Sequence, residues 1–299
     1  MHLTVGIFGD QELAKRMGKK GTTNDIAIYN HGSSEGVLTY VCPNSEKIQP
    51  LLQVLNMIDV PVIVVKEMSK EIGEMMIGID EMKFKKGFII TNVQETVQQF
   101  IKGTSLENFE FTDEKELRTK LLETNIDRGE DVYVPIDNYF NVKGIGTVIL
   151  GMVRSGKVNL HDKLMLEPLG REIVVKGIQS QDKDIKETEP GMRVGLNLKG
   201  VEVDEIKRGF VLCNSIEKTN DIKIKFNKNK FFKQEISKGM QVFLSVGLQT
   251  VTCNIDSFGE EMILKSNQTI AYRKNQTCLL ASQNDILPRI IGSGIIIIL

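Results

Sequence analysis

The pattern of apolar residues in this chain changes near Val132, and this change limits the folds open to it. Before that point, short β-branched runs alternate with stretches whose apolar residues recur at helical spacing. After it, apolar runs of strand length follow one another with only turn residues between them. A chain of 299 residues also exceeds what one hydrophobic core usually serves. We therefore expect an α/β domain first and all-β domains after it.

The α/β pattern covers residues 1–128. The expected strands are LTVGIF, DIAIYN, GVLTYV, VPVIVV and GFIIT. Two expected helices are EKIQPLLQVLNMIDV and DEKELRTKLLET, whose apolar residues fall on one helical face. Such alternation is typical of a mainly parallel sheet covered by helices.

The all-β pattern divides into residues 129–218 and 219–299, separated by the polar stretch NSIEKTND. In the first part, the expected strands are VYVPIDNYF, GTVILGMV, KLMLEPL, REIVVKGI, RVGLNLKG and GFVLC. In the second, they are DIKIKF, QVFLSVGL, QTVTCNIDSF, MILKS, QTIAYR, QTCLLAS and RIIGSGIIII. Regular short strands with this punctuation predict two β-barrels. The apolar end IIGSGIIIIL is too short for a membrane-spanning helix and is expected to be a buried strand.

The first strand leads into VGIFGDQELAKR, which nearly matches a phosphate-binding loop, G-x-x-x-x-G-K-[ST]. Gly9 and Lys15 stand in the motif positions, but Ala14 replaces the second glycine and Arg16 replaces the hydroxyl residue that holds Mg²⁺. At Ala14 we expect a methyl group in the turn, where a positive φ would cost about 1 kcal/mol. The stretch is therefore interpreted as the remnant of a phosphate loop.

Charge and cysteine content exclude several classes of site. The formal net charge is −1, so the molecule as a whole does not attract nucleic acid. Residues 219–299 nevertheless carry 10 Lys or Arg against 6 Asp or Glu. The four cysteines have neither zinc-ligand nor disulfide-framework spacing, and we expect them reduced and buried. We expect no metal, no cofactor and no DNA contact.

The order of these parts resembles the elongation factor Tu family of translational GTPases. The strongest match runs from FNVKGIGTVILGMVRSGKV to GFVLC, through the spacing of Gly144, Gly146, Thr147, Gly156, Asp162, Gly191, Gly195, Leu196, Arg208, Gly209 and Cys213. Within the family, GIFG, QVFLSVGLQTVTCNIDSF and RIIGSGIIIIL resemble archaeal selenocysteine-specific elongation factors. The resemblance implies a P-loop-GTPase-like α/β domain followed by two elongation-factor-type β-barrels.

The other nucleotide motifs of that family are missing. Residues 1–128 contain no D-x-x-G, and the strand VPVIVV continues as KEMSKEI without the aspartate that would bind guanine. The two switch regions are reduced to KKGTTNDIAIYNHGSSEG. We therefore expect a pseudo-GTPase, not an enzyme, that binds no nucleotide. The alternative is an active GTPase in which Lys15, Thr22 or Thr23 replaces the missing ligands.

A run of lysines and aromatics near residue 230 is a candidate RNA contact. Its members are Lys223, Lys225, Lys228, Lys230, Lys233 and Phe231. Lysines can neutralise phosphates and exposed aromatics can stack on bases. The resemblance implies that the last barrel helps to hold tRNA. The alternative is an edge strand protected by lysines, with its phenylalanines in the barrel core.

The first barrel carries four further candidates, Arg154, Arg171, Arg193 and Arg208. The resemblance implies that this barrel holds the aminoacyl end of tRNA in a shallow pocket, which these arginines could face. The alternative places them in solvated turns and surface ion pairs.

The resemblance and the missing motifs together predict a nucleotide-independent relative of these elongation factors. Its expected partner is tRNA or another RNA, or a protein of the translation apparatus, in the cytoplasm and away from membranes. Without a γ-phosphate to order switch loops, we expect one fixed interdomain arrangement. The competing hypothesis is a protein adaptor that binds no RNA.

Overall fold

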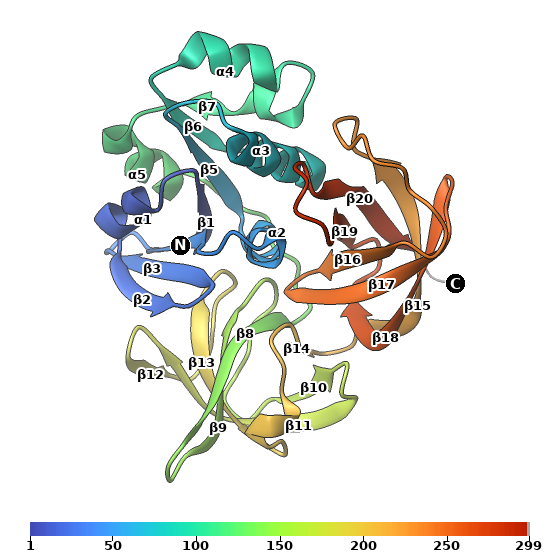
Figure 1. The fold of residues 1–299 in the computed structure, drawn as a ribbon. Coiled ribbons are helices and arrows are strands. Elements are labelled where there is room, and N and C mark those ends of the chain that lie inside the picture. The colour runs from blue at the N-terminus through green and yellow to red at the C-terminus, as the bar shows by residue number, and fades with distance from the viewer. Residues whose placement is uncertain (298–299) are drawn as a thin grey trace.

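The three sheets of the protein follow one another along the chain, as Figure 1 shows. The structure is a computed structural model and describes residues 1–297. The first sheet is open and covered by helices, and the other two close into β-barrels. The expected order of an α/β domain and two barrels is confirmed. The last two residues of the apolar end, 298 and 299, lie outside the described residues.

The α/β domain is built around a seven-stranded sheet in the order β2-β3-β4-β1-β5-β6-β7. Strands β4, β1, β5, β6 and β7 run parallel, whereas β2 and β3 add an antiparallel hairpin at one edge. Its elements are β1 (His2–Phe8), α1 (Gln11–Met17), β2 (Lys19–Thr23), β3 (Ile26–Gly32), β4 (Val37–Pro43), α2 (Ile48–Met57), β5 (Val60–Val65), α3 (Lys70–Met82), β6 (Phe88–Thr91), α4 (Gln94–Ile101), η1 (Ser105–Asn108), β7 (Glu110–Phe111) and α5 (Glu114–Leu122).

Helices cover both faces of this sheet. Helices α1 and α5 pack on one face, and α2, α3 and α4 pack on the other. Central strands buried on both sides, such as β5 with the sequence VPVIVV, follow from this three-layer arrangement. The sequence predicted α2 and α5 but not α1, α3 or α4. Asp10 and Ser69 accept backbone hydrogen bonds at the starts of α1 and α3, and both are N-cap residue types that could have indicated these helices.

The first barrel is a ring of six strands, β10-β14-β8-β9-β13-β11, closed by pairing of β10 with β11. The short strand β12 pairs with β11 outside the ring. The elements are β8 (Tyr133–Val142), β9 (Gly146–Met152), β10 (Lys163–Glu167), β11 (Arg171–Ser180), β12 (Lys183–Ile185), β13 (Arg193–Lys199), η2 (Val203–Glu205) and β14 (Val211–Cys213).

The second barrel closes in the order β15-β18-β17-β16-β19-β20. Its strands are β15 (Glu217–Lys228), β16 (Gln241–Val246), β17 (Gln249–Ser257), β18 (Glu261–Tyr272), β19 (Thr277–Ser282) and β20 (Ile290–Ile297). Two expectations are wrong here. MILKS and QTIAYR are one strand, because residues 266–269 form a bulge opposite Asn220 and the ladder continues beyond them. The expected linker NSIEKTND ends inside β15, which begins at Glu217.

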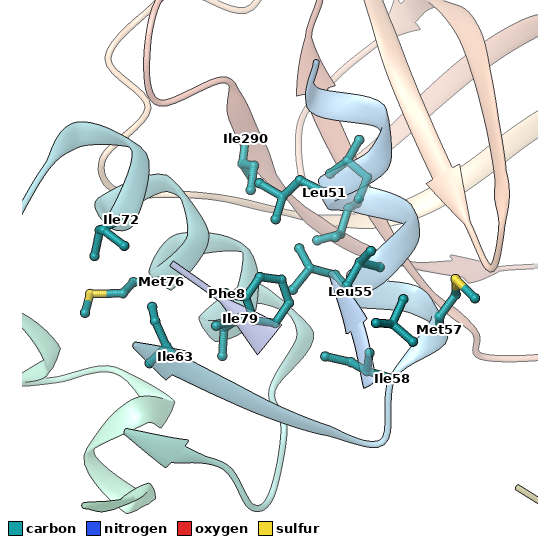
Figure 2. Close-up of a cluster of buried hydrophobic side chains, with 14 of the residues drawn as sticks. Phe8, Leu51, Leu55, Met57, Ile58, Ile63, Ile72, Met76, Ile79 and Ile290 are labelled. Carbon is teal, nitrogen blue, oxygen red and sulfur yellow. The ribbon is translucent and has the colours of Figure 1, made fainter. Parts of the chain in front are cut away.

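The α/β domain and the second barrel share one hydrophobic core. Helix α2 lies between the α/β sheet and strands β16 and β17 (Figure 1). Figure 2 shows Ile290 of β20 beside Leu51 of α2, with Leu55 and Phe8 deeper in the same cluster. Polar bonds add to this contact, since Gln53 donates to the carbonyl of Leu248 at 3.1 Å. The two parts are thus packed like halves of one domain.

Two buried carboxylates on α3 fix the second barrel against this helix. Glu74, whose side chain is 2% exposed, accepts from the Arg289 guanidinium at 2.6 and 3.1 Å and from its backbone amide. Glu81 accepts from Asn229 at 2.7 Å and from the Ser293 hydroxyl at 2.5 Å. Because these charges are satisfied only across the interface, separation would leave them unpaired.

A third buried carboxylate joins the α/β domain to the first barrel. Asp59, 1% exposed, lies between Arg128 at 2.6 Å and Arg154 at 2.8 Å. The two barrels also meet directly, where the Arg273 guanidinium stacks 4.1 Å above the Tyr133 ring. Each of the three domains is therefore in contact with the other two.

We predict that Glu74→Ala lowers the free energy of unfolding by about 3–5 kcal/mol, because the Arg289 guanidinium is left buried without a counter-charge. Chemical denaturation followed by circular dichroism measures this change. Glu187→Ala is the control, since Glu187 pairs with Lys157 in solvent and its loss should not shift the midpoint. Equal midpoints for the two variants would contradict the prediction.

Candidate functional site: the phosphate-loop remnant and the interdomain cleft

The connection between β1 and α1 is too short to form a phosphate loop. It consists of Gly9 and Asp10 alone, and the helix begins at Gln11. Residues 11–14, which would form the cradle of backbone amides in a working loop, are helical instead. Gly9 has φ +86°, and a Cβ at this position would overlap the carbonyl oxygen of Val64. A glycine is therefore needed here because the chain after β1 passes close to the backbone of β5.

The N-terminus of α1 already holds a carboxylate. Asp10 accepts from the amide of Glu12 at 3.0 Å, and Lys66 lies 3.0 Å from its other oxygen. Burial would raise the pKa of Asp10, but the bonds from Lys66 and the Glu12 amide hold it below its ordinary value. A phosphate at this helix end would meet a fixed negative charge.

The other motif positions point away from this turn. Ala14 is completely buried in the core beneath α1, so the expected strain of its methyl group in a turn is wrong. Lys15 pairs with Glu12 one turn away on the helix surface at 2.5 Å. Arg16 forms two bonds to Glu114 on α5, at 2.8 and 2.9 Å.

A hairpin occupies the segment to which the two switch regions were expected to be reduced. Strands β2 and β3 pair through Lys20 with Tyr29, and β3 continues the sheet by pairing with β4 along its length. The segment is thus ordered by backbone bonds to its neighbours. Its outer strand, β2, has the sequence KKGTT and forms the free edge of the sheet.

A cleft of about 780 Å³ separates this hairpin from the first barrel, and we call it the interdomain cleft. Strands β2 and β3 and helix α1 form one wall, and β9, β11 and β13 form the other. Its polar and charged lining includes Lys19, Lys20, Asn30, Arg118, Gln179 and Arg193. Its volume lies in the range of sites that hold small organic ligands.

Positive charge dominates the interdomain cleft. Lys19, Lys20 and Arg118 form no ion pair within residues 1–297, and Asp182 is the one carboxylate among the described lining residues. Arg118 donates to the carbonyl of Met17 at 3.2 Å, while its buried Nε has no partner in the described chain. The cleft can therefore accept an anion without first breaking a salt bridge. Sequence reasoning missed these three residues.

Arg193 lies at the floor of the cleft and is held in place. It donates to both oxygens of Asp137, at 2.8 and 3.1 Å, and approaches the hydroxyl of Thr22 at 3.4 Å. Of the four arginine candidates, Arg193 is the one that lines this cleft.

Two other arginines hold the domains together, so for them the expectation of solvated turns is wrong. Arg154 donates to the carbonyls of Met57 and Ile58 and lies against Asp59. Arg208 donates to both carboxylate oxygens of Asp25 across the interface, at 2.9 and 2.7 Å. The Asp25 carboxyl is desolvated, which would raise its pKa, but Arg208 keeps that pKa below its ordinary value. Arg171 does form a surface pair, with Glu205 at 2.6 Å.

The lysine-rich stretch lies in the second barrel and lines no part of the cleft. Strand β15 pairs with both β18 and β20, so the alternative of an edge strand is wrong. Lys223 pairs with Glu261, and Lys225 is exposed on the strand. The ring of Phe232 enters the barrel core, whereas Phe231 next to it is 43% exposed.

Comparison with known proteins relates the chain to translation factors. The family model for elongation factor Tu domain 2 matches residues 146–213. The chain is 35% identical to an uncharacterized protein of Methanocaldococcus jannaschii, with 98% of each covered. It is 30% identical to the selenocysteine-specific elongation factor of the same organism, over 88% of this chain. The chain is therefore homologous to selenocysteine-specific elongation factors and contains an elongation factor Tu domain 2.

This elongation factor Tu relative spans 55% of the length of the selenocysteine-specific factor that it matches. Its fold is that of elongation factor SelB from Methanococcus maripaludis, solved with the GTP analogue GppNHp. The TM-score is 0.85 at 21% identity, covering 99% of this chain and 78% of that one. The resemblance and the fold class inferred from the sequence are thereby confirmed.

Two further properties concern the described residues only. None of the helices within residues 1–297 combines the length and apolarity needed to cross a bilayer. In the same range, no three His, Cys, Asp or Glu side chains come together as metal ligands. All four cysteines are free and buried, and burial raises the pKa of each thiol to about 12.

We predict that Gly9→Ala destabilises the protein more than Gly103→Ala. Both glycines have positive φ, so each substitution costs about 1 kcal/mol in backbone strain. Only at Gly9 does the new Cβ meet a backbone oxygen, which should add about 1–3 kcal/mol, whereas Gly103 has open space around it. Urea unfolding of the two variants measures the difference. Equal losses of unfolding free energy in the two variants would mean that the close contact at Gly9 does not matter for stability.

Proposed function

We propose that this protein binds tRNA or another RNA in the interdomain cleft, without GTP. The observation that carries the proposal is the set of unpaired cations, Lys19, Lys20 and Arg118, facing an open cleft beside the elongation-factor barrel. Phosphates of an RNA end would replace counterions at these side chains. The resemblance adds that this barrel holds the aminoacyl end of tRNA in related factors. This function places the protein in the cytoplasm, with the translation apparatus.

Loss of nucleotide binding is part of the proposal. It is supported by the two-residue connection before α1, the carboxylate of Asp10 at the helix end and the hairpin in place of switch segments. In the rewired GTPase, Lys15, Thr22 or Thr23 would replace the missing ligands. Lys15 and Thr23 line one hollow, whereas Thr22 faces Arg193 in the interdomain cleft. This arrangement disfavours a rewired site that uses Thr22 together with Lys15, and Lys15 beside Thr23 is already paired with Glu12.

The contacts between the domains support a single interdomain arrangement. The shared core around α2 and the buried carboxylates Asp59, Glu74 and Glu81 would all be disrupted if the domains rotated. In a switching factor, the nucleotide changes which contacts form. Here we infer constitutive binding, controlled by the concentration of the RNA.

We predict that Lys19→Glu with Lys20→Glu weakens tRNA binding and flattens its salt dependence. Each lysine that contacts a phosphate contributes about one unit to the slope of log K against log salt, so the slope should fall by about 2. Filter binding of total host tRNA, aminoacylated and deacylated, at several salt concentrations measures both effects. Both lysines are exposed, so the variant should fold normally.

The matched control is Lys143→Glu with Lys199→Glu, which changes the net charge equally at exposed sites outside the cleft. This control variant should keep the parent protein's slope of log K against log salt. Equal losses in both double variants would show that only overall charge matters. If the parent protein binds no tRNA at low salt, the proposal fails and the protein-adaptor hypothesis takes its place.

A second prediction concerns GTP. Isothermal titration with GTP and Mg²⁺ should give no saturable heat, because no amide cradle exists before α1 and Asp10 repels phosphate. Lys15→Ala should behave identically. Magnesium-dependent binding that disappears in Lys15→Ala would instead establish the rewired GTPase.

A further inference from the structure

An apolar groove of about 330 Å³ lies between the α/β domain and the second barrel. Helix α3 forms its floor, α4 and η1 form one side, and two loops of the second barrel form the other. Its apolar lining includes Met76, Ile77, Phe100, Ile101, Phe231 and Pro288. The rings of Phe100 and Phe231 are 58% and 43% exposed. Two exposed aromatics on one groove are typical of an interaction surface.

The polar groups that line the groove are used within the protein. Glu74 is bound by Arg289. Asp80 accepts from the amide and hydroxyl of Ser105, at 2.8 and 2.9 Å, and pairs with Lys83. The Thr104 hydroxyl donates to the carbonyl of Ile101. The groove therefore offers carbon surface to a ligand, with few free hydrogen-bonding groups.

Four lysines, on helix α3, at the end of strand β15 and in the loop that carries Phe231, have no acidic partner in the described chain. Lys70 lines the groove, and Lys230 lies 5.1 Å above the ring of Phe231. Lys233 and Lys228 donate only to the backbone carbonyls of Lys230 and Gln234. In the described part of the chain, none of these four lysines has a carboxylate within ion-pair distance. An apolar strip bordered by unpaired positive charge complements a segment with the opposite pattern.

We propose that this groove docks an acidic amphipathic segment of a partner protein. Apolar side chains at i, i+3, i+4 and i+7 of a helix would fill the space between Phe100 and Phe231, as in other helix-in-groove contacts. Carboxylates on the flanking positions would pair with Lys70, Lys230 and Lys233. The buried aromatic contacts would supply most of the affinity, and the exposed charges would set the choice of partner.

The groove favours a protein over RNA. A base could stack on Phe231 beside Lys230, but among the described residues of the floor only Lys70 offers a free donor to phosphate groups. The groove also shares no lining residue with the interdomain cleft. The two proposals are therefore independent and can fail separately.

Synthetic peptides test the proposal on the full-length protein. The probe is a labelled peptide of about 15 residues, near the shortest length at which an isolated helix is marginally stable. It carries Leu and Phe on one helical face and Glu on the other, and a second peptide carries Lys in place of Glu. Fluorescence anisotropy should give a Kd of about 1–50 μM for the acidic peptide and at least tenfold weaker binding for the basic one.

Substitutions locate the binding site. Phe231→Ala should weaken binding of the acidic peptide about tenfold, whereas Phe258→Ala, which truncates a 52% exposed ring outside the groove, should not. Lys230→Glu with Lys233→Glu should reverse the preference between the peptides, and Lys225→Glu with Lys274→Glu should not. Phe258→Ala should bind tRNA as the parent does.

Three results would overturn the proposal: no binding of either peptide, equal binding of both, or equal losses in Phe231→Ala and Phe258→Ala. Selective loss of tRNA binding in Lys230→Glu with Lys233→Glu, with peptide binding unchanged, would assign the lysine-rich loop to RNA instead.

Discussion

The arrangement of this protein depends on carboxylates that are buried between domains and bonded across the interfaces. Asp59 is held by Arg128 and Arg154 beside the first barrel, and Glu74 is held by Arg289 of the second. Removing one partner of such a pair leaves a charge in a low-dielectric interior, which costs several kcal/mol. The hydrophobic cluster around α2 adds non-directional attraction, and the ion pairs determine the angle at which the parts meet.

The proposed fixed angle agrees with the absence of the nucleotide motifs from residues 1–128. Once Ala14 is buried under α1 and Asp10 caps that helix, the turn after β1 works as an ordinary strand-to-helix connection. The hairpin β2–β3 then completes the sheet where a factor that switches would need mobile segments. The proposed loss of the phosphate site and the buried contacts between domains are therefore compatible, because neither needs a second conformation.

The periodicity of the sequence predicted much of the fold and less of the site. Most strands and the helices α2 and α5 follow from local apolar patterns, which also mark the change to β structure near Val132. Helix α1 is seven residues long and too short for a periodic signal. The arginine roles could not be predicted, because Arg154 bonds Met57, 97 residues away, and Arg208 bonds Asp25, 183 residues away. Lys19 and Lys20 in the sequence KKGTT could be predicted only weakly, because lysines are common on any exposed edge strand.

The rigid interfaces also determine how the two candidate surfaces are presented. The interdomain cleft lies against the first barrel and the apolar groove against the second, and each is bordered by the α/β domain. Because both positions are set by buried contacts, neither surface has to be ordered when a ligand arrives, and the conformational cost of binding is low. The two surfaces share no lining residue, so the two proposed ligands would not compete for the same side chains. Any coupling between them would have to pass through α2 and α3, whose packing resists movement.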